Sequence, residues 1–290
     1  MAGVETDPLP DLASGFQTLK LEPHDDVAAI FPARPQKRNA LSSELSRELV
    51  QALATHADVA GIGAIVLTGE DPAFCAGMDL HEPSAAADLA GQRERLAVSA
   101  HHHHVLWNYP KPVVCAVNGP ALGGGLDLSP LRDIRVASER ATFGDPQIKF
   151  GVPTLFTPLR WLIGDGRARE LCLTGRVVDA AEALRLGLVS RVVGHEQLLT
   201  HAIQLAADIA QAPAQTLAAV KGYMASAGSR DFEHSLRVEH DDAFAAMFAH
   251  AGEAQQGGVI AERAAQRLAR LPPEGNSAPA TQEVTWAHPR

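Results

Sequence analysis

The chain has 290 residues, 46% of them hydrophobic, and a formal net charge of −9 at pH 7. This length and apolar content suffice for one large α/β unit with a sizeable core. The acidic balance argues against a general nucleic-acid surface, so no nucleic-acid partner is expected. The N-terminus has no signal-peptide pattern, and no apolar run approaches the roughly twenty residues of a membrane span. We therefore expect a cytoplasmic protein with no membrane partner.

Strand-like apolar runs alternate with helical patterns along most of the chain, which indicates parallel α/β structure. The expected strands cover residues 16–22, 27–31, 64–68, 113–117, 134–137 and 188–193. Ser42 or Ser43 is expected to cap a helix that runs to about residue 57, with Leu45, Leu49 and Leu53 on one face. A second helix is expected over residues 86–107.

After residue 193 the strand patterns stop, and helices are expected over residues 196–212, 214–227, 231–251 and 260–271. Residues 1–15 and 272–290 are rich in Pro, Gly, Ser and other polar residues, so we expect flexible tails there. The predicted organisation is a tail (1–15), an α/β core (16–205), a helical part (206–271) and a second tail (272–290).

The three cysteines, Cys75, Cys115 and Cys172, lie in or beside apolar runs and are odd in number. Buried free thiols are therefore expected rather than disulfides. No partner base for Cys75 is evident, so a nucleophilic role is not assigned to it.

Three consecutive glycines, Gly123 to Gly125, follow the apolar run 113–117 and open a short helical segment. Without a Cβ at this turn, a ligand can approach the backbone while free N–H groups of a helix N-terminus point at it. Gly77 follows the run 64–68 in a similar way. Two such loops can supply two N–H donors to an oxyanion on a thioester carbonyl, although small residues in tight turns are the simpler interpretation of either loop alone.

Six ordered blocks carry a family resemblance: 35–41, 74–80, 118–125, 141–146, 173–175 and 182–189. In this order they resemble the crotonase family, also called the enoyl-CoA hydratase/isomerase superfamily, over roughly residues 16–270. The resemblance implies an α/β spiral of repeated β-β-α units with a C-terminal helical part. It also implies a homotrimer or a dimer of trimers, an acyl-CoA thioester substrate and no tightly bound cofactor, since coenzyme A enters as part of the substrate.

By the same resemblance, the N–H groups of Met78 and Gly124 are the two oxyanion donors. The segments implied to hold the nucleotide and pantetheine parts of CoA, largely through backbone groups, contain Lys37, Ala40, Ala76, Asp79 and Leu80. Lys37 and the neighbouring Arg38 are equally well interpreted as solvated loop charges.

Hydratases of this family use two glutamates that bracket one water, and Asp127 and Gln147 stand at the matching positions. Aspartate keeps the charge with about 1.5 Å less reach, and glutamine is neither acid nor base near neutral pH. These departures argue against strong two-carboxylate hydration. An isomerisation needs one base, which Asp127 or, as a second candidate, Asp145 can supply.

Other interpretations of these residues stay open. Asp127 can simply complement the dipole at a helix N-terminus, and Asp145, which precedes a proline, can be an ordinary turn residue. Decarboxylation of a malonyl-type thioester needs mainly the oxyanion hole and a polar group such as Gln147. We therefore expect an acyl-CoA enzyme that forms a stabilised thioester enolate, with single-carboxylate isomerisation or a hydration variant favoured. The alternatives are a decarboxylase and a catalytically silent CoA-binding subunit.

Two further features are weaker. Many relatives carry more glycines in the stretch 151–158, and the bulkier Leu155 and Phe156 found there either reshape the acyl pocket or pack the core. Leu155 also matches the catalytic aspartate of dehalogenase-like relatives, which argues against that chemistry. The run His101 to His104 has no third metal ligand at a recognisable spacing, so no metal is expected and these histidines are expected to be solvent-facing or structural.

Overall fold

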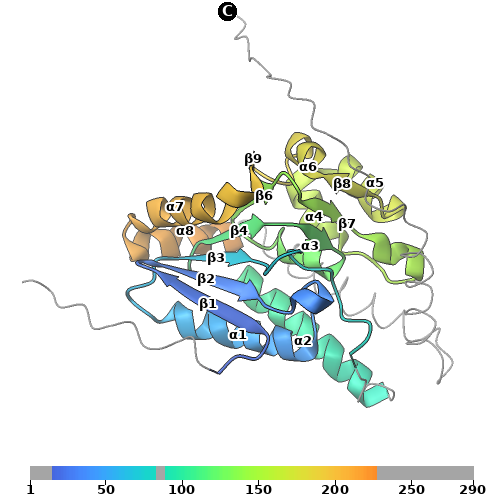
Figure 1. Cartoon of the computed structure of the whole chain (residues 1–290), viewed down its shortest axis with the longest axis horizontal. Coiled ribbons are helices and arrows are strands. Elements are labelled where there is room, and N and C mark those ends of the chain that lie inside the picture. Colours follow the sequence, from blue (N-terminus) through green and yellow to red (C-terminus); the bar gives the residue numbers. More distant parts are fainter. Residues whose placement is uncertain (1–14, 83–88, 227–290) are drawn as a thin grey trace, which may run out of the picture.

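The computed structural model describes residues 15–82 and 89–226 (Figure 1). The predicted helices 231–251 and 260–271, the start of helix 86–107 and both tails apart from Gly15 lie outside these residues. The strands are β1 (Leu19–His24), β2 (Val27–Pro32), β3 (Ala64–Thr68), β4 (Val113–Val117), β5 (Pro120–Leu122), β6 (Ile134–Ser138), β7 (Thr142–Gly144), β8 (Val177–Asp179) and β9 (Arg191–Val193). The α-helices are α1 (Ser43–Ala57), α2 (Leu89–Trp107), α3 (Gly124–Leu128), α4 (Phe156–Ile163), α5 (Asp165–Thr174), α6 (Ala180–Leu186), α7 (Leu198–Ala210) and α8 (Ala214–Ser226).

Within the described part, six strands form one sheet in the order β1-β2-β3-β4-β6-β9. β1 and β2 are antiparallel, and every later neighbour is parallel. The short strands β5, β7 and β8 form a second sheet. Because parallel strands carry their carboxyl ends at one edge of a sheet, the loops after β2, β3 and β4 emerge together. The predicted glycine loops are two of these three.

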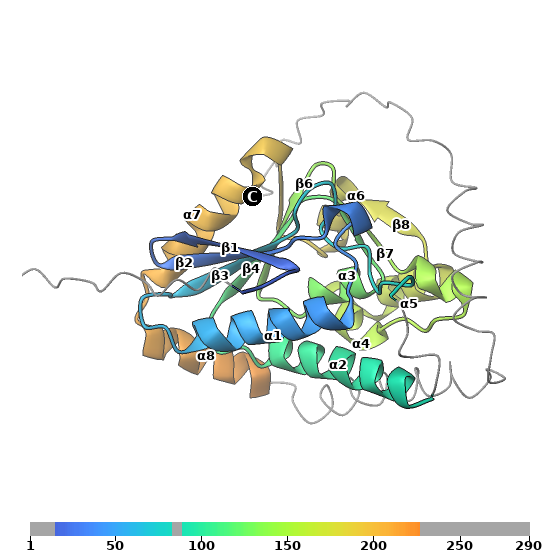
Figure 2. The ribbon, with the colours of Figure 1, turned by 60° about the horizontal axis from the view of Figure 1, so that its bottom comes forward.

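Helices cover both faces of the larger sheet (Figures 1 and 2). Successive side chains of a strand point to opposite faces. Accordingly Val27 and Ala29 of β2 pack in the cluster that contains α7, whereas Ala28 and Ile30 belong to the main core on the side of α1. Both cores consist of aliphatic side chains with little or no exposed surface. The sheet therefore sits as a middle layer, as the near-continuous apolar runs predict.

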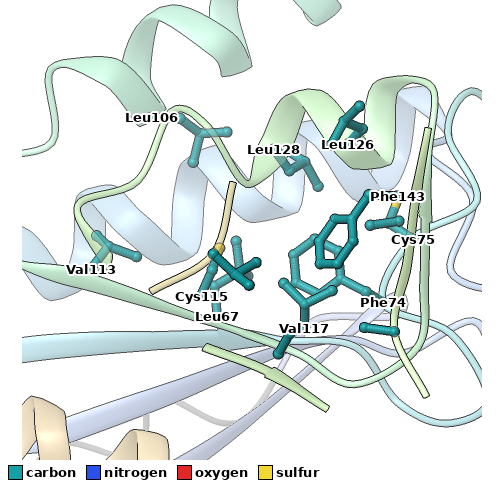
Figure 3. Packing of buried hydrophobic residues seen from close by; sticks show 14 of the residues in the cluster. Leu67, Phe74, Cys75, Leu106, Val113, Cys115, Val117, Leu126, Leu128 and Phe143 are labelled. Atoms are coloured by element: carbon teal, nitrogen blue, oxygen red, sulfur yellow. The ribbon is translucent and has the colours of Figure 1, made fainter. Parts of the chain in front are cut away.

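The short helix α3 is anchored in the main core (Figure 3). Its Leu126 and Leu128 are fully buried and pack in the same cluster as Phe74 after β3 and Phe143 of β7. A helix of five residues is too short to be stable alone. Burial of each leucine contributes about 1.5–3 kcal/mol and holds the helix in place. The N-terminus of α3, with its glycines, is thereby fixed against the loop that follows β3.

The strands predicted over 64–68 and 113–117 and the cap of the first helix are confirmed, with the N–H of Leu45 donating to Oγ of Ser42 at 3.1 Å. The prediction over 188–193 is wrong in its first half, since β9 begins only at Arg191. The N–H of Leu188 donates to the carbonyl of Ala183 at 2.9 Å. The first residues of the predicted strand therefore cap the C-terminal end of α6 instead. The described ranges contain no helix long and apolar enough to cross a membrane.

Candidate active site

Backbone pairing joins the three loops at the carboxyl edge of the sheet. Leu41, in the loop after β2, forms an isolated parallel bridge with Met78 in the loop after β3. Cys75 in that second loop forms another with Ala121 of β5. The N–H of Gly123 then donates to the carbonyl of Gly144 at 2.9 Å, which ties the glycine turn to β7. The loops are therefore held in register by main-chain hydrogen bonds.

The bridge at Leu41 leaves the N–H of Met78 free. In parallel pairing, a residue bonds to the two residues that flank its partner. Here the N–H of Leu41 donates to the carbonyl of Gly77 at 2.7 Å, and the N–H of Asp79 donates to the carbonyl of Leu41 at 2.9 Å. Met78 itself is skipped, and its N–H donates to no other described residue. This amide is available to a ligand.

The N–H of Gly124 is the second available donor. Gly124 is the first residue of α3, where helix geometry leaves the N–H without an acceptor, and none of the described residues supplies one. A Cβ built on Gly124 would lie 3.8 Å from the nitrogen of Met78, so the two amides are neighbours. Met78 and Gly124 are half-buried, whereas Gly123 and Gly125 are buried. The predicted oxyanion pair is thus brought together and kept accessible.

Glycine is required where these two loops meet. Gly77 has φ +89°, and a Cβ there would lie 2.6 Å from the carbonyl oxygen of Leu122. A Cβ on Gly125 would lie 2.0 Å from the carbonyl oxygen of Cys75. Real Cβ atoms do not approach so closely, so larger residues would push the loops apart. The glycines therefore serve the close approach itself, and not only the turns.

Asp127 lies in α3 and is 5% exposed. Its N–H donates to the carbonyl of Gly123 at 3.1 Å, so the backbone of Asp127 is fixed relative to Gly124 in the same helix. Burial raises the pKa of the nearby Cys75 thiol to about 12, and the Asp127 carboxylate adds to this rise. Cys75 therefore stays a thiol, in agreement with the prediction that it is no nucleophile. All three cysteines are buried, and none forms a disulfide with another described residue, as expected.

Gln147 lies beside the glycine turn. Its Nε2 donates to the carbonyl of Pro153 at 2.8 Å, and a Cβ on Gly123 would lie 2.5 Å from its Oε1. The amide is therefore oriented with its acceptor toward the oxyanion loop. An amide in this place can accept a hydrogen bond but cannot exchange a proton near neutral pH.

Asp145, the second candidate base, is more deeply buried than Asp127, with 0% exposure. Neither carboxylate oxygen has a hydrogen-bond partner among the described residues. Burial raises the pKa of this carboxyl to about 7. Asp145 stands at a turn, as one interpretation expected, yet its side chain makes no capping hydrogen bond. Asp145 is therefore a buried acid with no solvent-exposed surface.

The predicted CoA-binding residues lie on the first two loops. Ala40 and Asp79 are buried, Ala76 is half-buried, and Lys37 and Leu80 are exposed. The N–H groups of Ala40, Ala76 and Asp79 all donate to other backbone carbonyls, those of Lys37, Arg38 and Leu41. Backbone contacts to CoA at these three residues are therefore limited to carbonyl oxygens. Their role in binding CoA stays a prediction.

Two residues that the sequence analysis did not single out connect these loops. Asn39, fully buried at φ +54°, accepts from the N–H of Arg34 at 2.9 Å and donates to the carbonyls of Glu70 and Ala73, each at 2.6 Å. Arg34 forms an ion pair with Asp79 at 2.7 Å. An asparagine in a loop, here directly after Lys37 and Arg38, is a recognisable signal for left-handed backbone. The ion pair of Arg34 with Asp79 leaves no recognisable pattern in the sequence around either residue.

The histidine run and Leu155 are the remaining candidates. His101 and His104 are exposed, and His102 and His103 are buried with ring centroids 4.2 Å apart. No group of three or more potential metal ligands occurs among residues 15–82 and 89–226. Leu155 is 5% exposed and packs in a small cluster with Leu131 and Trp107. An apolar, buried Leu155 cannot supply a carboxylate.

The fold and this pair of amides define a class of α/β protein suited to stabilising an oxyanion with backbone N–H groups. The enoyl-CoA hydratase/isomerase family matches residues 22–265. A probable enoyl-CoA hydratase of Rhizobium meliloti is 42% identical over 205 residues, which cover 67% of this chain and 76% of the relative. The chain therefore belongs to the enoyl-CoA hydratase/isomerase family and is an enzyme of that type.

Two further proteins show the breadth of the family. The crystal structure of an enoyl-CoA hydratase/isomerase from Xanthobacter autotrophicus Py2 superposes with a TM-score of 0.77 at 27% identity, covering 89% of this chain and 100% of the other. A 4-chlorobenzoyl coenzyme A dehalogenase of Arthrobacter is 34% identical over 235 residues, which cover 79% of this chain and 85% of the relative. These similarities confirm the predicted fold class and leave the particular reaction to the residues of the site.

Proposed function

We propose that this protein isomerises an enoyl-CoA thioester, with Asp127 as the single base and the N–H groups of Met78 and Gly124 as the oxyanion donors. The observation that carries the proposal is that these two amides are neighbours and neither donates to another described residue. A well-placed donor of this kind stabilises an enolate oxygen by about 3 to 4 kcal/mol.

The chemistry needs one proton carrier. The Asp127 carboxylate removes a proton from C2 of a 3-enoyl thioester, and the negative charge moves to the thioester oxygen between the two N–H groups. The protonated Asp127 then returns the proton to C4, which gives the 2-enoyl thioester and restores the carboxylate. No net proton is taken up or released, so the cycle requires no second acid.

Asp127 is preferred to Asp145 because it shares the short helix α3 with the proposed oxyanion donor Gly124. Asp127 is 5% exposed and belongs to the helix that carries Gly124, whereas Asp145 is 0% exposed. Gln147 supplies a hydrogen-bond acceptor beside the oxyanion loop.

Three alternatives remain beside isomerisation. A malonyl-type decarboxylation uses the two oxyanion donors and Gln147 as the polar group beside the leaving carboxylate. Hydration by a single carboxylate is a variant of the isomerase chemistry. The last alternative is not an enzyme but a catalytically silent CoA-binding subunit. The loss of both family glutamates favours it, and the intact pair of amides argues against it.

A panel of crotonyl-, 3-enoyl- and malonyl-type CoA thioesters, assayed together with CoA-thioester binding, tests the proposal. We expect turnover of the 3-enoyl thioester to exceed hydration of the crotonyl thioester. Loss of CO₂ from the malonyl thioester alone would assign the decarboxylase instead. Binding without turnover of any thioester would identify the silent subunit.

A further inference from the structure

Arg34 joins the loop after β2 to the oxyanion loop. Its Nη2 lies 2.7 Å from Oδ2 of Asp79, and its Nη1 donates to the carbonyl of Ala40. Its own main-chain N–H donates to the side chain of Asn39 at 2.9 Å. The two side chains of the ion pair are only 17% and 4% exposed. Arg34 is therefore a largely buried tie between two loops that the chain separates by 45 residues.

The carboxylate, the backbone carbonyl and the backbone N–H of Asp79 all form hydrogen bonds. Asp79 directly follows Met78 in the chain. Besides Arg34, its carboxylate accepts from the N–H of His81 at 3.0 Å. Its carbonyl accepts from Nη2 of Arg95 at 3.0 Å, and its N–H donates to the carbonyl of Leu41 at 2.9 Å. Since Gly77 on the other side of Met78 is also bonded to Leu41, the peptide N–H of Met78 is fixed from both sides.

The charge of Asp79 is compensated by the same contacts. Burial is the largest single influence and raises its pKa, but the hydrogen bonds from Arg34 and His81 and the charges of Arg34 and Lys37 outweigh it and lower the pKa overall. The carboxylate is therefore ionised, although it is 4% exposed. A buried carboxylate without its cation would oppose a second negative charge at the neighbouring oxyanion site.

We propose that Arg34 is a positioning residue for the reaction: through Asp79 it fixes the Met78 N–H toward the thioester oxygen and cancels a buried negative charge beside the enolate. Arg34 itself is not assigned a contact with the reacting atoms. The inference rests on the proposed oxyanion role of Met78. A purely structural tie would affect stability, whereas a positioning residue changes how strongly the bound carbonyl is polarised.

The test compares wild type with Arg34→Gln, Asp79→Asn and the double variant. The readouts are kcat and KM on a 3-enoyl-CoA and the carbonyl stretching band of bound, ¹³C-labelled butyryl-CoA, which cannot react by isomerisation. We expect wild type to shift the band to lower frequency and Arg34→Gln to lose most of that shift. Its kcat should fall by about 10² or more, with KM changed by less than about threefold. The double variant should recover at least about tenfold of the lost kcat, because no uncompensated carboxylate remains.

Arg47→Gln is the matched control, since it removes an arginine whose ion pair with Glu94 at 2.6 Å is largely exposed, and it should behave as wild type. An unchanged band and kcat in Arg34→Gln, or a kcat of the double variant no higher than that of Arg34→Gln, would overturn this inference. Either result would leave the proposed function unaffected. No band shift in wild type would instead refute the oxyanion assignment of the proposed function.

If urea titrations show that Arg34→Gln does not fold, Arg34→Lys takes its place in the test. It keeps the charge but not the planar two-armed geometry, so we expect a partial shift, and a full wild-type shift would contradict the positioning role.

Discussion

Leu41 lies against Gly124: a Cβ added to Gly124 would come 3.2 Å from Cδ1 of Leu41 and 3.8 Å from the nitrogen of Met78. The backbone of Leu41 also forms the bridge that leaves the N–H of Met78 free. One apolar residue therefore contacts both halves of the proposed oxyanion hole. A side chain at position 124 would therefore enter the space beside the N–H of Met78.

Substitution of Gly124 should affect activity according to the size of the side chain. Gly124→Val should lower kcat by at least about 10²-fold, because its branches would occupy the space in which the thioester oxygen must lie. Gly124→Ala should be milder, since the only tight contact is with the flexible end of Leu41. Steady-state kinetics with circular dichroism as a folding control measures both variants. A fully active Gly124→Val would remove Gly124 from the oxyanion hole.

Asp127→Asn should keep shape and hydrogen bonding but delete the base, and we expect kcat on the best substrate to fall by about 10² to 10⁴. Asp145→Asn is the matched control and should retain most activity, because that carboxyl has no solvent-exposed surface. The opposite pattern, with Asp127→Asn active and Asp145→Asn inactive, would assign the base to Asp145.

Asp145 should make stability fall as the pH rises from about 4 to about 7. Its pKa is raised by burial to about 7, against about 3.9 in an unfolded chain. Between these values the native state holds a proton that the unfolded state lacks, so unfolding becomes easier by up to about 1.4 kcal/mol per pH unit. Urea unfolding of wild type and Asp145→Asn across this range measures the difference. Parallel curves for the two proteins would show that Asp145 is ionised in the native state throughout.

Restoring both family glutamates, as Asp127→Glu with Gln147→Glu, should raise crotonyl-CoA hydration. The Oε1 of Gln147 already faces the glycine turn, so a carboxylate at this position points into the site. The substitution removes the donor to the carbonyl of Pro153, a loss of about 1 kcal/mol. Hydration assays on both single variants and the double variant compare the contributions. Hydration no higher than in wild type would make pocket shape, with Leu155 and Phe156, the better explanation of specificity.

We also predict a homotrimer or a dimer of trimers, an expectation that the resemblance to the family carries. Apolar residues of the predicted C-terminal helices, which lie outside the described residues, are expected to contribute: Phe232, Leu236, Phe244, Met247 and Phe248. Sedimentation velocity at micromolar concentration gives the mass directly. A monomer under these conditions would refute the prediction.

A feature of the site can be predicted from the sequence when neighbouring residues in the chain produce it, and cannot when it depends on contacts between distant segments. The oxyanion loops are visible in the sequence because close backbone approach requires glycine at Gly77 and Gly125. The strands β5, β7 and β8 have three residues each, too few to show a period of two. The ion pair between Arg34 and Asp79 joins distant segments, and the depth of Asp145 depends on how the second sheet packs. Such contacts arise only in the folded chain.

A crystal structure with a bound acyl-CoA analogue such as butyryl-CoA would show where the thioester oxygen binds. We expect this oxygen within about 2.7–3.1 Å of the main-chain nitrogens of both Met78 and Gly124. The α-carbon should face Asp127 rather than Asp145. A thioester oxygen bound elsewhere, or in contact with only one of the two amides, would contradict the account.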